Sequence, residues 1–178
     1  MVSVEIKAPA GTELVIPVAV RKPFSDDGDF SLPGTGGNVP AGEVFISPLV
    51  GDGKDQGCCG RIVYDGSMSV NAGCVAIKTP IVVDVVGGFI TNISGGAEAQ
   101  KLLDTITQAE EEARAMGKDG RLSVEDSLLY CRNARNIGEL GIGLNPAATI
   151  TGNMLEDEKA FRTCHIAIGE NYDNDAHA

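Results

Sequence analysis

Residues 81–93 read IVVDVVGGFITNI, and this stretch decides the fold class. Its two apolar runs are rich in β-branched residues and flank Gly87-Gly88, a strong signal for a tight hairpin turn. The first run contains Asp84 and is far too short to cross a bilayer. The stretch therefore predicts two antiparallel strands joined by a short turn.

Short strand-like segments fill the chain before this hairpin, with turns rich in glycine and proline between them. They lie at residues 2–6, 13–20, 43–48, 60–64, 69–70 and 73–77, and one of the turns is expected at residues 71–73. Short strands at this spacing are typical of an antiparallel sheet or barrel. Residues 22–42 hold three prolines and five glycines, and they predict a long loop that leads into Glu43.

Helical periodicity begins after Gly95-Gly96. Apolar residues at helical spacing predict a helix over residues 97–116, which we expect to end at Gly117. Ser123 is the expected N-cap of a second helix, over residues 124–135, because its side chain can accept a hydrogen bond from the first helical turn.

A last strand is predicted at residues 163–169, and His165 lies in it. Hydrophobic residues make up 43% of the chain, which is enough for a core. We therefore expect one α+β domain over residues 1–178. Its N-terminal two thirds should be mostly antiparallel sheet or barrel-like, followed by helices and a strand that carries a metal ligand.

Charge and composition exclude several classes of protein. The net charge of −11 and a sequence pI near 4.5 argue against nucleic-acid binding, because phosphates attract lysine and arginine. The N-terminus lacks the layout of a signal peptide, and the five cysteines make an odd count that fits reduced thiols. We expect a cytoplasmic protein that binds neither nucleic acid nor membrane.

Three ionisable residues stand in apolar, glycine-flanked segments: Glu43, Glu139 and His165. A buried carboxylate needs a partner, and a cation is the usual one where several carboxylates converge. Glutamate with histidine is a ligand set for Zn, Mn, Fe or Co. Two other interpretations stay open: a hydrogen-bonded core histidine, and pairing of Glu139 with Arg132 or Arg135.

The acidic run Leu155-Glu156-Asp157-Glu158-Lys159 precedes the last strand. One interpretation is a solvated helix face. The other is that one of its carboxylates contacts a metal ligand, rather than the metal itself, and orients that ligand.

Four motifs together resemble the aminopeptidase T/aminopeptidase S family of two-metal exopeptidases, which is leucyl aminopeptidase-like. They are Asn38–Phe45, Glu139–Pro146, Leu155–Lys159 and Thr163–Gly169. The resemblance covers nearly the whole chain and corresponds to the C-terminal, catalytic portion of that family. The family's N-terminal domain and its terminal His-x-Asp pair have no counterpart in this sequence.

The resemblance implies that Glu43, Glu139, His165 and Tyr172 bind metal and that Glu139 and Tyr172 act in catalysis. It implies Zn, Co or Mn as cofactor and a metal-activated water that releases the N-terminal residue of a small peptide substrate. It also implies a homo-oligomer.

Two alternative hypotheses belong to other classes. The same resemblance extends to mononuclear Fe(II) ring-cleaving dioxygenases that act on dihydroxypyridines, in which two histidines and a carboxylate hold iron. A third hypothesis is a noncatalytic structural or assembly relative. Metal content separates the three, because they expect about two divalent ions, one iron ion or no metal per chain.

Overall fold

The computed structural model describes residues 2–70 and 73–178, so the turn expected at residues 71–73 lies partly outside the described residues. The chain has an α+β fold in which each pair of neighbouring strands is antiparallel, as predicted. The described strands form three separate sheets rather than one barrel.

The largest sheet has five strands in the order β1-β2-β5-β8-β9. Their bounds are Ser3–Lys7 for β1, Glu13–Pro17 for β2, Cys59–Tyr64 for β5, Ile81–Val86 for β8 and Phe89–Ser94 for β9. The turn between β8 and β9 is the predicted one, and Gly87 and Gly88 have positive φ angles of 54° and 89°. Such angles suit glycine, which explains the glycine pair at this turn.

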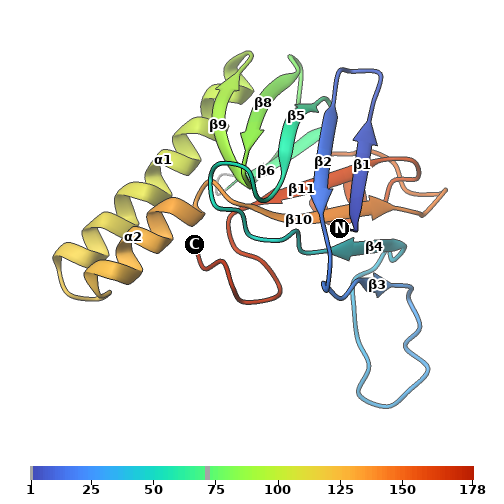
Figure 1. Cartoon of the computed structure of the whole chain (residues 1–178). Helices are drawn as coiled ribbons and strands as arrows, with labels where there is room; N and C mark the ends of the chain where they lie inside the picture. The colour runs from blue at the N-terminus through green and yellow to red at the C-terminus, as the bar shows by residue number, and fades with distance from the viewer. Residues whose placement is uncertain (1, 71–72) are drawn as a thin grey trace.

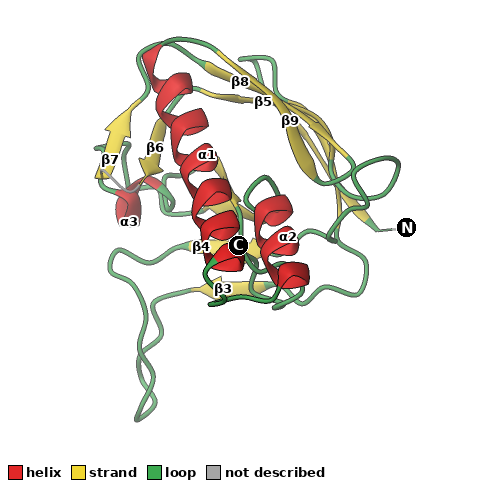
Figure 2. Cartoon of the chain, turned by 90° about the vertical axis from the view of Figure 1, so that its left-hand side faces the viewer, coloured by secondary structure: helices red, strands yellow, loops and turns green. Residues whose placement is uncertain are grey.

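The second sheet has four strands in the order β11-β10-β4-β3, and a hairpin pairs β6 with β7. Their bounds are Cys164–Ile168 for β11, Ile137–Gly143 for β10, Glu43–Ile46 for β4, Phe24–Asp26 for β3, Ser67–Val70 for β6 and Gly73–Ala76 for β7. In Figure 1 the strands of the five-stranded sheet run across those of the four-stranded sheet. The loop between β3 and β4 projects away from both sheets (Figures 1 and 2).

The core lies between the two large sheets and beside the longest helix. The five-stranded sheet contributes Ile16, Ile62 and Val83, and Leu140 faces them from β10. Helix α1 (Ala97–Lys118) packs against β8 and β9 and contributes residues such as Ile106. Each fully buried aliphatic side chain of this kind stabilises the fold by roughly 1.5–3 kcal/mol.

The helices differ from their predicted bounds in one informative way. Helix α1 continues through Gly117, where an added Cβ would lie only 2.5 Å from Ser127 Oγ of α2 (Val124–Asn133). The glycine therefore permits close contact between α1 and α2, which lie side by side in Figure 1, and does not end the helix. Ser123 caps α2 as predicted, because its Oγ accepts the Asp126 N–H at 3.0 Å.

A short helix, α3 (Met154–Asp157), precedes β11. Strand β3 was not predicted, because its three residues lie within the stretch expected to be loop and pair only with β4. No helix among the described residues is both long and apolar enough to cross a membrane.

Candidate functional site

Strand β10 brings the predicted ionisable residues together. It lies between β4 and β11, with Gly143 opposite Glu43 and Gly141 opposite His165. Because side chains alternate along a strand, Glu139, Gly141 and Gly143 share one face of β10 with those partners. An added Cβ at Gly141 would lie 1.9 Å from His165 Nε2, so the imidazole occupies the space that this glycine leaves.

The three side chains meet at the imidazole. His165 Nε2 lies 3.0 Å from Glu139 Oε1 and 3.4 Å from Glu43 Oε2. The side chains are 20%, 13% and 7% exposed for His165, Glu139 and Glu43. Within the described chain, Glu43 Oε2 and His165 Nδ1 are buried without a hydrogen-bond partner. A buried carboxylate oxygen without a donor is a place where a cation is the fitting partner.

Lys159 supplies one positive charge to this cluster, and the sequence analysis missed it. Its ammonium is fully buried, 2.6 Å from Glu43 Oε1 and 3.2 Å from Glu158 Oε2. Burial alone would lower the pKa of Lys159, but hydrogen bonds and charge from Glu43 and Glu158 raise it above its usual value. The lysine therefore stays charged near neutral pH. The available signal was a lysine between an acidic run and the apolar pair Ala160-Phe161.

The acidic run is not a fully solvated face, because Asp157 is buried, and a supporting role for one of its carboxylates behind metal ligands stays a prediction. Asp157 is buried and accepts hydrogen bonds from Ser67 Oγ at 2.5 Å and from the Thr151 N–H at 2.7 Å. It therefore joins the β6–β7 hairpin to the turn before α3. Glu158 is the member that reaches the cluster, through Lys159.

The arginines considered as partners of Glu139 lie elsewhere. Arg135 Nε donates to Glu110 Oε1 at 2.5 Å. Arg132 donates to the Gly51 carbonyl and lies over the Phe89 ring, 4.4 Å from its centroid. Neither arginine neutralises Glu139 in the way that the alternative interpretation required.

Tyr172 stands beside the cluster, on the segment after β11. Its backbone N–H donates to Ser47 Oγ at 3.1 Å, and its ring centroid lies 5.0 Å from that of Phe45. The residue is 59% exposed and, with Glu139, lines an open groove of about 520 Å³. Burial, followed by the charges of Glu139, Glu158 and Glu43, raises the pKa of the Tyr172 hydroxyl. The phenol is therefore neutral near pH 7 and can donate a hydrogen bond.

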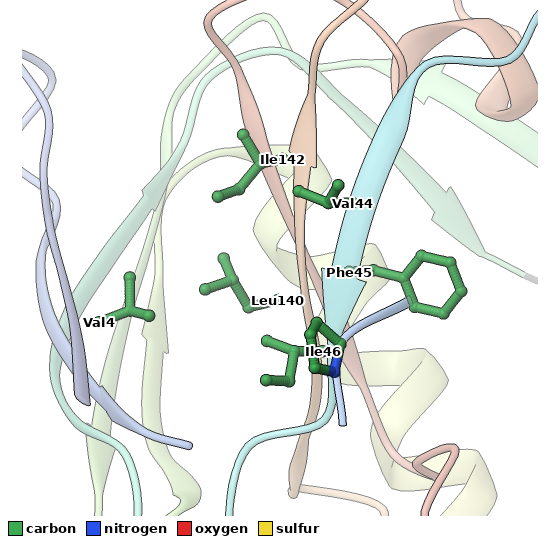
Figure 3. Close-up of a pocket in the computed structure, with 7 residues that line it drawn as sticks. Val4, Val44, Phe45, Ile46, Leu140 and Ile142 are labelled. Atoms are coloured by element: carbon green, nitrogen blue, oxygen red, sulfur yellow. The ribbon is translucent and has the colours of Figure 1, made fainter. Parts of the chain in front are cut away.

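The opposite face of β4 and β10 is apolar. Figure 3 shows Phe45 pointing away from Val4, Leu140 and Ile142, which line a pocket of about 80 Å³. This pocket is small and its lining residues are not ionisable, so it offers no group for catalysis or metal binding. The polar face with the open groove is where chemistry can occur.

The donor types at the cluster suit a divalent ion. One imidazole nitrogen and two carboxylates are acceptable to Fe, Mn, Co and Zn. Among residues 2–70 and 73–178, however, no group of three His, Cys, Asp or Glu side chains is arranged to hold an ion. In the structure His165 Nε2 contacts Glu139 Oε1, and Glu43 Oε1 contacts the Lys159 ammonium. The other histidine, His177, lies by Tyr130 and Glu170.

Comparison with known proteins gives the family. A family model described as NicX, 2,5-dihydroxypyridine 5,6-dioxygenase, matches residues 2–168. No curated protein matches the chain.

Two solved structures share the fold. The structure of 2,5-dihydroxypyridine dioxygenase from Pseudomonas putida KT2440 is 22% identical, with a TM-score of 0.69, over 97% of this chain and 45% of that one. Wild-type AmpT from Thermus thermophilus is 17% identical, with a TM-score of 0.58, over 96% of this chain and 36% of that one. The chain thus spans less than half the length of either protein.

The match corrects the resemblance drawn from the motifs. Assignment to the aminopeptidase T/aminopeptidase S family is wrong, and with it the expected peptidase activity on small peptides, since the NicX model matches nearly the whole chain. The four motifs coincide with β4, β10, α3 and β11 and with the ends of these elements. They describe a fold that also occurs in both solved structures, so they could not separate the two families. This chain belongs to the NicX family of 2,5-dihydroxypyridine 5,6-dioxygenases.

Proposed function

We propose that the chain contributes the metal-binding sheet of a dioxygenase that opens the ring of a dihydroxylated pyridine. The observation that carries this proposal is the meeting of His165 Nε2 with the carboxylates of Glu139 and Glu43 on three adjacent strands. Membership of the NicX family implies a divalent metal, and we propose Fe(II) rather than Zn, Co or Mn.

His165, Glu139 and Glu43 would hold the ion, through Nε2 and one carboxylate oxygen of each glutamate. This set has one histidine and two carboxylates, where the dioxygenase resemblance expects two histidines and one carboxylate. Bound Fe(II) would supply the one-electron chemistry that dioxygen needs to react with an aromatic ring. For Nε2 to serve as ligand, the imidazole must be neutral with its proton on Nδ1. This tautomer gives up the Nε2–H contact with Glu139 so that Nε2 can bind the ion, and its Nδ1–H has no acceptor among the described residues.

The groove beside the cluster suits a small flat substrate. The Tyr172 ring lines the groove, and the Phe45 ring packs against it with the two centroids 5.0 Å apart. The neutral Tyr172 hydroxyl can donate to a ring oxygen, and Glu139 can accept a proton from a ring hydroxyl. These contacts would orient the ring with its hydroxylated edge toward His165.

The test measures iron binding and ring opening in the same sample. The chain is loaded with Fe(II) without oxygen and then mixed with 2,5-dihydroxypyridine and air. We expect about one iron per chain, oxygen uptake and loss of the pyridine absorbance. His165→Ala should abolish both iron binding and turnover, whereas Glu5→Gln on the exposed face of β1 should change neither.

Two results would reject the proposal. One is a chain that binds no divalent ion under these conditions. The other is stoichiometric iron with the pyridine left intact, which would favour a structural role for the metal.

A further inference from the structure

The ion pair between Lys159 and Glu43 is fixed at both ends by backbone hydrogen bonds to one segment of the chain. The Lys159 carbonyl accepts the Asn145 N–H at 2.9 Å. The Leu144 N–H donates to the Gly42 carbonyl at 2.9 Å, directly before Glu43. Asn145 Nδ2 adds a bond of 2.9 Å to the Ala41 carbonyl. These bonds fix the backbone at Lys159 and beside Glu43.

Close packing restricts the same segment further. An added Cβ at Gly42 would lie 2.8 Å from Asn145 Cβ, and one at Gly143 would lie 2.1 Å from the Ala160 carbonyl oxygen. The backbone next to both partners of the ion pair is therefore packed tightly against residues 143–145. Its stem is buried, so it has no route to solvent in this conformation.

The two carboxylate oxygens of Glu43 have different surroundings, one beside Lys159 and one beside His165. Oε1 accepts the Lys159 hydrogen bond at 2.6 Å. Oε2 lies 3.4 Å from His165 Nε2 and is buried without a hydrogen-bond donor. A carboxylate without Lys159 could rotate about its last bond and present either oxygen.

We propose that Lys159 is a positioning residue that holds Glu43 Oε1, so that Oε2 alone faces His165 and is available to a divalent ion. The inference rests on the proposed function, which supplies the divalent ion. It adds that only one oxygen of Glu43, Oε2, would bind that ion. Glu158 Oε2 also contacts the ammonium, at 3.2 Å. A Glu43 side chain already held by Lys159 has less conformational entropy left to lose when an ion binds.

The first experiment needs no metal. The chain contains two histidines, so the imidazole ¹⁵N signals can be assigned to His165 and His177 with a His177→Gln variant. We expect Lys159→Met to move the His165 signals and leave those of His177 in place, at constant pH. Lys159→Arg should restore most of the wild-type shift, because it retains a buried cation with donors.

A matched control removes a different partly buried ion pair. Arg135→Met breaks the contact between Glu110 of α1 and the segment after α2, and it should lower thermal stability without moving the His165 signals. If Lys159→Met does not fold, Lys159→Gln replaces it, because its amide is too short to hold Glu43 Oε1. Unchanged His165 signals in a folded variant without the ammonium would overturn the proposal.

The second experiment uses Co(II) as a visible probe of the metal site. We expect Lys159→Met to weaken Co(II) binding at least tenfold and to change its absorption spectrum, with recovery in Lys159→Arg. Equal or tighter binding in Lys159→Met would overturn the positioning role, because the ammonium would then only repel the ion. If the wild-type chain binds no Co(II), the proposed metal site fails, and the ¹⁵N result still decides whether Lys159 positions Glu43.

Discussion

Substituting Gly141 by alanine tests the geometry of the site with one methyl group. An added Cβ would lie 1.9 Å from His165 Nε2 and 2.1 Å from Cε1, so the imidazole must move. Those atoms are the end of a side chain that is 20% exposed, so the ring can move without displacing backbone. The prediction is loss of metal binding with little loss of fold stability.

The expected free-energy changes explain why fold stability should change little although metal binding is lost. Replacing glycine by alanine at a compatible backbone position stabilises a protein by about 0.4–1 kcal/mol. Losing the hydrogen bond between His165 and Glu139 costs about 0.5–1.5 kcal/mol. The two nearly cancel, and about 1 kcal/mol corresponds to roughly 2–4 °C in a chain of this size. We therefore expect the melting temperature of Gly141→Ala to fall by less than about 5 °C.

The assay combines thermal unfolding followed by circular dichroism with Co(II) titration. The expected result is a Kd raised by roughly tenfold or more, as for lost contacts around other metal ligands. Gly66→Ala is the control, because an added Cβ there meets nothing within 4 Å. An unchanged Kd would show that His165 does not need the space above Gly141, which would refute the reasoning.

Three further predictions concern stability. Burial would raise the pKa of Asp157, but hydrogen bonds from Ser67, Thr151 and Gly152 lower it below the usual 3.8. The ionised carboxylate therefore stabilises the fold fully above the unfolded pKa of 3.8, and this stabilisation is lost as pH falls through the lower folded pKa. Asp157→Asn should reduce this acid dependence of the unfolding free energy in denaturant titrations. Gly117→Ala should destabilise the chain by about 1–3 kcal/mol despite its better helix propensity, because the methyl group meets Ser127; chemical unfolding measures the difference. Ser123→Ala should cost about 0.5–2 kcal/mol in the same assay through loss of the cap of α2.

Much of the fold followed from local signals. The Gly87-Gly88 turn and the cap at Ser123 have a local cause, namely a positive φ angle and a side-chain acceptor for a free N–H. Gly117 was misread, because a glycine that ends a helix and a glycine that admits a second helix look alike in sequence. Strand β3 depends on pairing with β4, which no local pattern encodes.

The candidate site was only partly predictable. Glu43, Glu139 and His165 stood out as ionisable residues in apolar segments, and the structure brings them together; their role as metal ligands stays a prediction. Lys159 was missed, because a lysine is usually exposed and its burial here depends on contacts with Glu43 and with the end of β10.

The alternation along β10 links the hydrophobic core and the polar site. Leu140 faces the core, while Glu139 and Gly141 face the opposite side of the same strand. Inserting or deleting one residue here would exchange the two faces and place a carboxylate in the core. Replacing residues or reshaping the surrounding loops can therefore alter this site alone, whereas a change of length between Glu139 and Gly143 would disturb the site and the core together.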